Sequence, residues 1–497
     1  MAAVVIARLL GPASYGIYSI ALLVPATLFE IVGFGVNMGI SRLTAYHISK
    51  LEAERARRIT RNAIAFEVVL GAALAGLVYL GSGPISYALF HRPEAVPYLR
   101  ESSLLVLGEA MLQSSISAFI GWNMVGTATL LSLSQSAMKF VLSTSLVVWG
   151  YGVNGAIAGH VASYLVAGVF ALSVVAKRRL AGPTKSNHGV LEDIEYAVRY
   201  GSPLAAANLV STLSSYFVIF LMALVGTNQV IGYYSAGANV TAIITRSSAG
   251  ISLALLPTFA GLHGIGSDMK NALRLAVKYT AYLLTPIIAF IAFFPDLVIR
   301  VLYGASFVEA APFLRLLAIG YLPMVVGMTV VPTYFNGIGR TRLTLYSTLS
   351  GSVLLYALAP VLGIFAGALD ILYSVVVSNA AIAVVALALS SRYLFAKVDL
   401  TSSARLFVSA AVSYLLLSIV RIPLPPTAGS LLVNGALFLA LYATIAPLIR
   451  SIDFVDVANL GGIVDSFGLI SHVVRPLLSW ERRMLELSHT LTGRKKT

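Results

Sequence analysis

The chain has 497 residues, of which 58% are hydrophobic and only 11% are charged. Soluble domains carry about 25% charged residues, so the composition excludes an ordinary soluble protein, and its apolar, aromatic-rich character excludes a disordered one. The 34 Lys and Arg residues outnumber the 20 Asp and Glu residues, which gives a net charge of +14, and no Cys is present. Disulfides, thiolate catalysis and Cys-ligated metals are therefore excluded, and the composition indicates a polytopic membrane protein.

Apolar segments that are long enough to cross a bilayer as helices, about 20 residues each, recur along the whole chain. Because they are continuously apolar rather than alternating, they favour a helical bundle over a β-barrel. In chain order the thirteen segments are 16–37, 62–82, 98–121, 128–150, 153–175, 199–224, 229–259, 271–294, 309–333, 342–365, 368–390, 404–421 and 428–449. The sequence therefore predicts an all-α polytopic membrane protein with about 13–14 transmembrane helices.

Residues 1–7 are also apolar, but Arg8 follows them and leaves too few residues to span the membrane. We interpret this stub as the outer end of a truncated first helix, whose beginning is missing from the chain. A wrongly chosen start codon and a genuinely short first helix both agree with the pattern.

Most of the 34 basic residues lie in stretches that alternate with the predicted spans, namely 38–61, 176–198, 260–278, 334–345, 391–405 and 450–497. Lys and Arg concentrate in cytoplasmic loops, so this asymmetry predicts a multi-pass protein of the cell membrane with a cytoplasmic C-terminus. The positive charge then reflects topology and anionic headgroups, and it indicates no nucleic-acid partner. The tail 450–497 has the periodicity of an amphipathic helix on the inner leaflet, with Trp480 as an interfacial anchor.

The two halves of the chain repeat one pattern. Gly-Ile-Tyr-Ser at 16–19 recurs as Gly-Tyr-Tyr-Ser at 232–235, and Pro-Tyr-Leu-Arg at 97–100 recurs as Pro-Phe-Leu-Arg at 312–315. The offset covers an even number of spans, which predicts two pseudo-symmetric six-helix lobes of parallel orientation. The expected divisions are an N-terminal lobe 1–175, a cytoplasmic linker 176–198, a C-terminal lobe 199–390, an extra helix pair 404–449 and the cytoplasmic tail 450–497.

The opening of the chain resembles that of a known family. Ala-Arg-Leu-Leu-Gly-Pro at 7–12, followed by Tyr-Gly-Ile-Tyr at 15–18, is similar to the A-R-x-L-G-P-x-x-Y/F-G-x-Y opening of polysaccharide exporters. These are Wzx-type lipid-linked oligosaccharide flippases of the MOP superfamily, alongside MATE antiporters and MurJ-type lipid II flippases. The resemblance implies a transporter that flips a polyprenyl-diphosphate-linked oligosaccharide to the outer leaflet for polysaccharide assembly, by alternating access of two lobes. Membrane lipids are implied as partners, and glycan-assembly proteins are left open.

Ionisable residues inside the predicted spans are functional hypotheses, because they are costly to bury in lipid. Glu109 and Lys139 lie on adjacent antiparallel spans, both about 17 Å from the same membrane face at about 1.5 Å per residue. We expect them to form an ion pair, either as a structural pair or as part of a transport site. Glu67 lies near the inside end of its span, where we expect its carboxylate to reach water.

Glu30 and Arg246 are separated by 216 residues, which is the offset of the repeat at 16–19 and 232–235. In the family that this chain resembles, the second helix of each lobe lines the central cavity, so the resemblance implies that both residues point inward. They would then act as a lobe-closing latch, a substrate clamp or both, unless each satisfies a polar neighbour inside its own lobe. Arg8 matches the arginine of the family's opening motif and is expected at the outer mouth or as an interface anchor.

A second class of transporter remains open, namely an ion-coupled MATE-like multidrug exporter, for which Glu109 would supply an acidic cation site. A membrane enzyme would need carboxylate clusters in aqueous loops, and the longest outside loop, 83–97, offers only Glu94. The chain also has no P-loop and no metal-ligand spacing of His and carboxylates, so the sequence predicts no enzyme, no cofactor and no metal.

Overall fold

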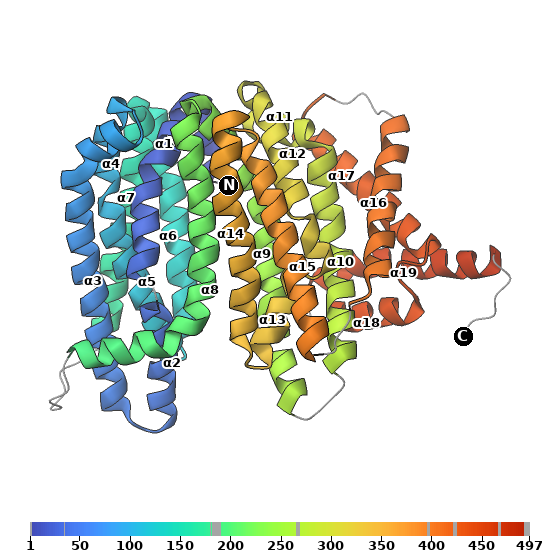
Figure 1. Ribbon diagram of the computed structural model, residues 1–497, viewed down its shortest axis with the longest axis horizontal. Coiled ribbons are helices and arrows are strands. Elements are labelled where there is room, and N and C mark those ends of the chain that lie inside the picture. The colour runs from blue at the N-terminus through green and yellow to red at the C-terminus, as the bar shows by residue number, and fades with distance from the viewer. Residues whose placement is uncertain are drawn as a thin grey trace. The chain divides into compact units, whose positions relative to one another are not determined.

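The computed structural model describes residues 2–33, 35–178, 180, 190–264, 269–394, 398–420, 425–465 and 469–491. In these ranges the regular elements are the helices α1–α19 and five short 3₁₀ or π segments, and none is a strand (Figure 1). The predicted all-helical class is therefore confirmed. Large apolar side chains are exposed along the helices, for example Leu80 at 80% and Phe365 at 85%, as expected of surfaces that face lipid.

Twelve helical stretches of the described residues are long and apolar enough to cross a membrane. They overlap all thirteen predicted segments, because the stretch Val125–Lys177 contains two of them, 128–150 and 153–175, although the predicted segments 16–37, 199–224 and 309–333 extend beyond the candidate spans. Within it, α6 (Val125–Leu146) passes through a π segment (Val147–Tyr151) into α7 (Gly152–Lys177). Gly150 and Gly152 have φ values of 93° and 53°, which glycine adopts without steric strain. The chain thus reverses direction in a turn that keeps a helical hydrogen-bond pattern.

The helices form two compact units. The first unit comprises Met1–Ala236 with Leu355–Ile371, and the second comprises Gly237–Leu354 with Leu372–Thr497. The helix that follows the linker 176–198 lies in the first of these compact units, and the predicted lobe boundaries stay a prediction. The elements of the first unit include α1 (Ala2–Val32), α2 (Val36–Ser49), α3 (Ala53–Pro84), α4 (Val96–Ser102), α5 (Leu104–Gly121), α6, α7 and α8 (Val190–Val225).

Helix α8 joins the first unit because it packs on α1, α2 and α3. The start of α9 (Asn228–Gly264) follows it, and here the repeated glycines of the sequence meet each other. A Cβ atom on Gly16 would lie 1.8 Å from the backbone oxygen of Asn228, and one on Gly232 would lie 2.0 Å from that of Pro12. Both members of the repeat therefore need glycine for the same reason, which is a close approach of α1 and α9.

Helix α1 is bent at Gly11, whose φ of 74° lies in the left-handed region, and a break that includes Gly33 and Gly35 separates it from α2. Gly35 also has a left-handed φ, 73°. These two positions redirect the backbone at both ends of the segment 12–32, which carries Tyr18 and Glu30. The core beside it is built from α2, α3, α5, α6 and α7 around Phe119, Leu112 and Ala171.

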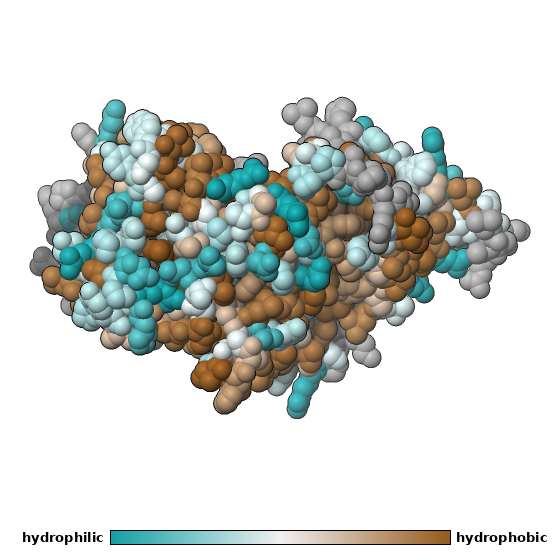
Figure 2. Space-filling view, turned by 90° about the horizontal axis from the view of Figure 1, so that it is seen from above, coloured by the Kyte–Doolittle hydropathy of each residue, from teal (hydrophilic) through white to brown (hydrophobic). Residues whose placement is uncertain are grey.

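The second unit contains the rest of α9 and the helices that follow. They are α10 (Met269–Phe293), α11 (Pro295–Tyr303), α12 (Ala311–Gly320), α13 (Val330–Gly337), the first part of α14 (Thr341–Phe365), α15 (Ile371–Leu394), α16 (Leu400–Val420), α17 (Ala428–Leu448), α18 (Phe454–Asp465) and α19 (Leu469–Leu491). Phe259, Tyr334 and Phe335 form the centre of its core. Figure 2 looks onto the upper ends of the helices and shows polar residues (teal) among hydrophobic ones (brown).

Buried polar contacts join the two tail helices, α18 and α19, to α10 within the second unit. Lys278 of α10 forms an ion pair with Asp456 of α18, and Tyr282 of α10 donates a hydrogen bond to Glu481 of α19. The indole nitrogen of Trp480 donates to Thr444 of α17 over 3.0 Å. In Figure 1, α19 runs across the direction of α16 and α17. The predicted amphipathic tail is helical, and part of its surface faces protein.

Candidate functional site

The polar residues predicted inside the first unit are gathered by glycine contacts between α5 and α7. A Cβ atom on Gly108 would lie 2.9 Å from the Cβ of Tyr164, and one on Gly168 would lie 2.8 Å from that of Met111. Because these glycines let the two helices approach closely, the Tyr164 hydroxyl lies near the carboxyl group of Glu109 and interacts with it. The sequence analysis predicted Glu109 but missed Tyr164, for which the only signal was the small-residue spacing of the two helices.

Glu109 is the centre of a group of charges contributed by different helices. Its carboxyl group interacts electrostatically with Lys139 of α6 and with Glu30 of α1. Tyr216 of α8 interacts with both Glu30 and Glu109. We call Glu30, Glu109, Lys139, Tyr164 and Tyr216 the polar cluster. Of the predicted site residues, the structure thus brings Glu30, Glu109 and Lys139 together.

An aromatic layer lies against the polar cluster. The Tyr18 hydroxyl and Nδ1 of His160 are hydrogen-bonded over 2.9 Å, and the two rings are stacked with centroids 6.2 Å apart. The imidazole also lies 5.5 Å from the Tyr164 ring, and Lys139 acts on it electrostatically. The repeated motif residue Tyr18 is therefore connected to the polar cluster through His160, an interaction that the spacing of the sequence did not reveal.

A cavity of about 330 Å³ lies beside the polar cluster inside the first unit. We call it the aromatic cavity, and it is lined by Leu23, Val24, Thr27 and Leu28 of α1, Leu213, Tyr216, Phe217 and Phe220 of α8, and Tyr356 of α14. The rings of Phe217 and Tyr356 meet edge to face at 4.8 Å. Tyr216 belongs to both groups, so it connects an almost wholly apolar cavity to the charged residues Glu30 and Glu109.

The two predicted arginines lie outside this arrangement. Arg8 is exposed on α1, before the bend at Gly11. Arg246 is exposed on α9 and belongs to the second unit, whereas Glu30 belongs to the first. The contact between Glu30 and Arg246 would join the two units, so it stays a prediction.

The structure corrects the expectation for Glu67. Its side chain on α3 is 0% exposed, and both carboxyl oxygens are completely covered. Its polar neighbour is Asn37 at the start of α2, whose side-chain oxygen Oδ1 accepts a hydrogen bond from the Ser117 hydroxyl over 2.9 Å. Glu67 therefore does not reach water, because the break between α1 and α2 places Asn37 over it and α5 packs against the same face of α3.

Arg92 is a buried arginine whose role the sequence analysis missed. It lies between α3 and α4, is 9% exposed, and donates hydrogen bonds to Asn228, to the carbonyl of Gly226 at 2.5 Å and to that of Ala223. A cation is well placed there because the C-terminal carbonyls of α8 carry partial negative charge. The signal was present in the sequence, since Arg92 is a basic residue in a predicted outside loop. Its contacts mark it as a structural residue.

Metal ligands do not assemble in the part of the chain that the structure describes, since no three His, Cys, Asp or Glu side chains cluster there. The polar cluster offers carboxylates, tyrosine hydroxyls and one ammonium group, and the aromatic cavity offers apolar walls. Together they can bind a molecule that has hydroxyl or charged groups at one end and hydrocarbon at the other.

Comparisons with known proteins agree with the opening motif. Residues 5–312 match a family described as "Polysaccharide biosynthesis protein". The succinoglycan biosynthesis transport protein ExoT of Rhizobium meliloti (strain 1021) is 25% identical over 349 residues, which cover 68% of this chain. The match spans 65% of the length of that relative.

Solved structures of the MOP superfamily share the fold. The lipid II flippase MurJ in an inward closed conformation has a TM-score of 0.74 at 12% identity, covering 90% of this chain and 96% of its own. An inward-facing multidrug resistance MATE transporter has a TM-score of 0.69 at 19% identity, covering 80% and 93%. A MOP superfamily transporter from Pyrococcus furiosus Vc1 (DSM3638) has a TM-score of 0.58 at 17% identity, covering 80% and 91%.

Proposed function

The chain belongs to the polysaccharide biosynthesis protein family, as its opening motif predicted, and on this premise we propose that it flips a polyprenyl-diphosphate-linked oligosaccharide across the cell membrane. The sugars and the diphosphate cannot cross hydrocarbon unaided, whereas the prenyl tail is at home there. The protein would give the polar end a path from the cytoplasmic to the outer leaflet while the tail stays in lipid. Glycan-assembly proteins that build or use the oligosaccharide are its natural partners.

The observation that carries this proposal is the junction of the polar cluster and the aromatic cavity in the first unit. Glu30, Glu109 and the hydroxyls of Tyr164 and Tyr216 supply hydrogen-bond acceptors and donors, which sugar hydroxyl groups need. Phe217 and Tyr356 supply ring faces and edges that suit the apolar side of a sugar ring or a prenyl unit. A substrate that is polar at one end and apolar at the other would engage both.

We assign the lobe movement to Glu30 and Arg246 within this proposal. The guanidinium of Arg246 can pair with the Glu30 carboxylate when the substrate is absent, and with diphosphate oxygens when it is present. Substrate would thus compete with an inter-lobe contact, which links occupancy to alternating access. Arg8, exposed before the bend of α1, would attract the diphosphate at the outer mouth.

The chain has no native Cys, so this pairing can be tested by crosslinking a Glu30→Cys/Arg246→Cys variant directly. We expect short bifunctional reagents to form this crosslink, and we expect added substrate to lower its yield. Arg246→Ala should lose flipping while its insertion into the membrane is unchanged. A variant with cysteines at Gly76 and Arg246 is the matched control, because Gly76 faces open space on α3. Normal flipping by Arg246→Ala together with no crosslink would reject the latch.

A second candidate function is an ion-coupled MATE-like exporter of lipophilic cations. It is favoured by one observation, namely that the polar cluster holds two carboxylates, Glu30 and Glu109, and a single cation, Lys139. Aromatic rings beside carboxylates attract organic cations. The polar cluster and the aromatic cavity are therefore the expected binding site under both functions.

The lipid-linked sugars of a strain that lacks the gene distinguish the two functions. We expect lipid-linked oligosaccharide to accumulate in the cytoplasmic leaflet, and the wild-type chain, but not Arg246→Ala, to remove it. A cytoplasmic reporter fused after Thr497 checks the predicted orientation in the same cells. Unchanged lipid-linked sugars combined with increased retention of a fluorescent lipophilic cation would favour the exporter.

A further inference from the structure

A second cavity, of about 450 Å³, lies in the second unit where the turn between α13 and α14 meets the end of α15. It is lined by Gly339, Arg340, Thr341, Arg342, Leu343, Tyr346, Leu389 and Tyr393. Gly339 has a φ of +76°, which lets the chain reverse between the two helices. The reversal places Arg340 before the first turn of α14 and Arg342 within it, so both arginines belong to the wall of the cavity.

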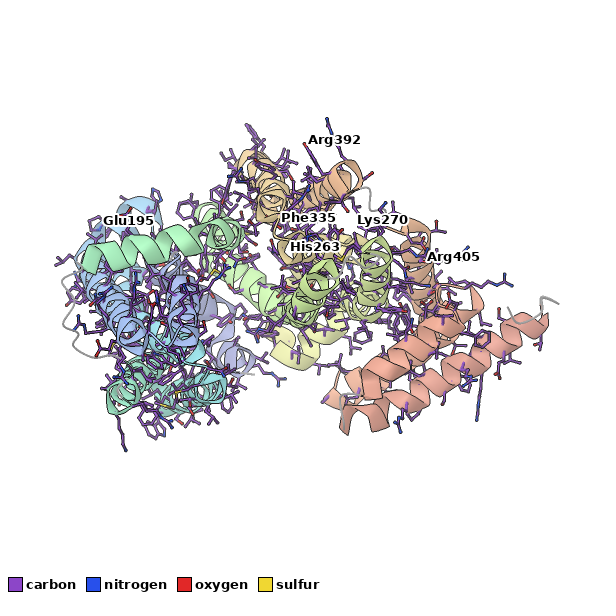
Figure 3. The ribbon with its side chains drawn as sticks, turned by 90° about the horizontal axis from the view of Figure 1, so that it is seen from below. Glu195, His263, Lys270, Phe335, Arg392 and Arg405 are labelled. Carbon is purple, nitrogen blue, oxygen red and sulfur yellow. The ribbon has the colours of Figure 1, made fainter. Side chains whose placement is uncertain are left out.

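Helices α14 and α15 pack closely side by side, and their directions tell at which end of the second unit the cavity lies. A Cβ atom on Gly351 would lie 2.4 Å from Cγ1 of Ile382 and 2.7 Å from the carbonyl oxygen of Ser378. Because consecutive spans run antiparallel, the N-terminus of α14 and the C-terminus of α15 lie at the same end of this unit. Figure 3 shows Lys270, Arg392 and Arg405 at that end. The cavity therefore opens where two candidate spans leave the membrane, at the level of lipid headgroups.

The mouth of the cavity is positively charged. Arg340 and Arg342 are both exposed, and neither forms an ion pair with a carboxylate of the described residues. Arg392, one residue before Tyr393, is placed over that ring at 5.9 Å and adds positive charge beside the mouth. Guanidinium groups bind phosphate oxygens through two parallel hydrogen bonds, so two of them at one opening suit a phosphate group.

The other part of the lining of the same cavity is largely apolar. Leu343 is 9% exposed, and the rings of Tyr346 and Tyr393 are about half exposed, at 54% and 51%. Leu389 completes this wall from the last turns of α15. A free anion would gain nothing from such a wall, whereas a hydrocarbon chain next to a phosphate would be removed from water by it. The cavity is thus amphipathic in the same sense as a lipid.

We infer that this cavity binds the phosphate group of a membrane lipid, with the beginning of its hydrocarbon chain against Leu343, Leu389 and the two tyrosines. The chemistry is a phosphate ester that carries a hydrocarbon chain. Two sources have it, an anionic phospholipid of the bilayer and a polyprenyl diphosphate. The site is separate from the polar cluster of the first unit, and its existence does not depend on the proposed function.

Native mass spectrometry of the full chain released from detergent micelles tests the site without a transport assay. The protein is titrated with phosphatidylglycerol, with farnesyl diphosphate and with inorganic phosphate. Arg340→Gln/Arg342→Gln removes the two cavity charges, and Lys270→Gln/Arg405→Gln removes two exposed charges at the same end outside the cavity lining. We expect the first variant to bind at least one of the two lipids about 30-fold more weakly, and the control to stay within a few-fold of the wild type.

A cavity-filling variant separates a cavity from a merely positive surface. Leu389→Trp keeps both arginines but places a larger side chain in the space beside the apolar wall, so we expect it also to weaken lipid binding. Loss with farnesyl diphosphate but not phosphatidylglycerol assigns the site to the carrier lipid, and the reverse assigns it to the bilayer lipid. Equal affinity of the arginine variant and its control, wild-type affinity of Leu389→Trp, or preferential binding of inorganic phosphate would each overturn the inference.

Discussion

The two units bury polar groups in different ways. In the first unit, Glu30, Glu109 and Lys139 form an unequal set of two acids and one base beside a cavity. In the second unit, Lys278 at 9% exposure is matched by one buried acid, Asp456 at 2% exposure, and its other partner at 3.7 Å, Asp453, is exposed. None of these residues lines the aromatic cavity or the cavity beside α14. A buried charge is tolerated when it is paired, so the matched pair is a structural tie. The unequal set beside a cavity is the arrangement that we propose as the binding site.

The difference also concerns what each set of polar groups connects. The polar cluster joins α1, α5, α6, α7 and α8, which are all candidate spans of the first unit. The ties of the second unit join α10 to α18 and α19, so they hold the tail helices rather than the spans. Variants of the two sets should therefore fail in different ways, which the following experiments measure.

The largest effect is expected from breaking the matched pair. Lys278→Met leaves Asp456 buried without its cation, which should lower the free energy of unfolding of the tail-docked state by about 3–5 kcal/mol. Proteolysis between α17 and α18, followed with thermal unfolding in detergent, measures the loss. Lys278→Met/Asp456→Leu is the control, and it should be much less destabilising because no buried unpaired charge remains and Asp453, the other partner of Lys278, is exposed. Equal losses in the two variants would contradict a structural tie.

The next effect sharpens the role of the unmatched set. Glu109→Gln should cost about 1–3 kcal/mol of stability, because Lys139 and Tyr164 lose a charged partner. Neutralising Lys139 as well, in Glu109→Gln/Lys139→Gln, should restore part of that stability but not flipping. Thermal unfolding and accumulation of lipid-linked oligosaccharide are measured on the same variants. Recovery of flipping in the double variant would make this pair structural, like Lys278 and Asp456, and would remove the contrast between the units.

A third effect depends on pH and belongs to the tail. Burial raises the pKa of Glu481 to about 7, and the hydrogen bond from Tyr282 opposes this rise. The docked tail therefore holds a proton between about pH 4.5 and 7 that the released tail has lost. Docking should weaken as pH rises through this window, by at most about 1.4 kcal/mol per pH unit, and level off above about pH 7.

Limited proteolysis of the tail from pH 5 to pH 8 measures this dependence. Glu481→Gln cannot ionise and should dock equally well across the range, at the strength that the wild type shows at low pH. Glu486→Gln, on the same helix, is the control and should keep the pH dependence of the wild type. A wild-type tail that is released on acidification would have the opposite sign and would contradict the assignment.

The smallest effect comes from the hydroxyl that connects Tyr164 to Glu109. Tyr164→Phe removes the polar interaction with Glu109 and should cost about 0.5–1.5 kcal/mol of stability. If the polar cluster binds substrate, Tyr164→Phe should lower the flipping rate clearly, although its melting temperature changes little. Tyr303→Phe, a buried tyrosine of the second unit, is the control and should leave flipping unchanged.

Spacing along single helices made part of the site predictable. Glu109 and Lys139 could be placed at one depth because each helix rises by a constant amount per residue. Gly16 and Gly232 could be paired because a repeat keeps the residues that a close approach requires. Tyr164, Tyr216 and His160 could not be predicted as their neighbours, because an aromatic residue in an apolar span has no periodic signal that tells a site from a lipid-facing surface. The exposure of Glu67 was predicted wrongly, because its position along α3 does not tell which other helices cover it.

The sequence alone determined the helical class, the spans and the family, because the thickness of a bilayer dictates the length of every apolar segment and the opening motif is local. Only the tertiary structure decided which faces meet. It assigned α8 to the first unit, joined two carboxylates and Lys139 to an aromatic cavity, and tied the tail to α10 through Lys278 and Tyr282. In lipid, helix faces are selected by close packing at small residues and by a few polar contacts, and both depend on partners that are distant in the sequence.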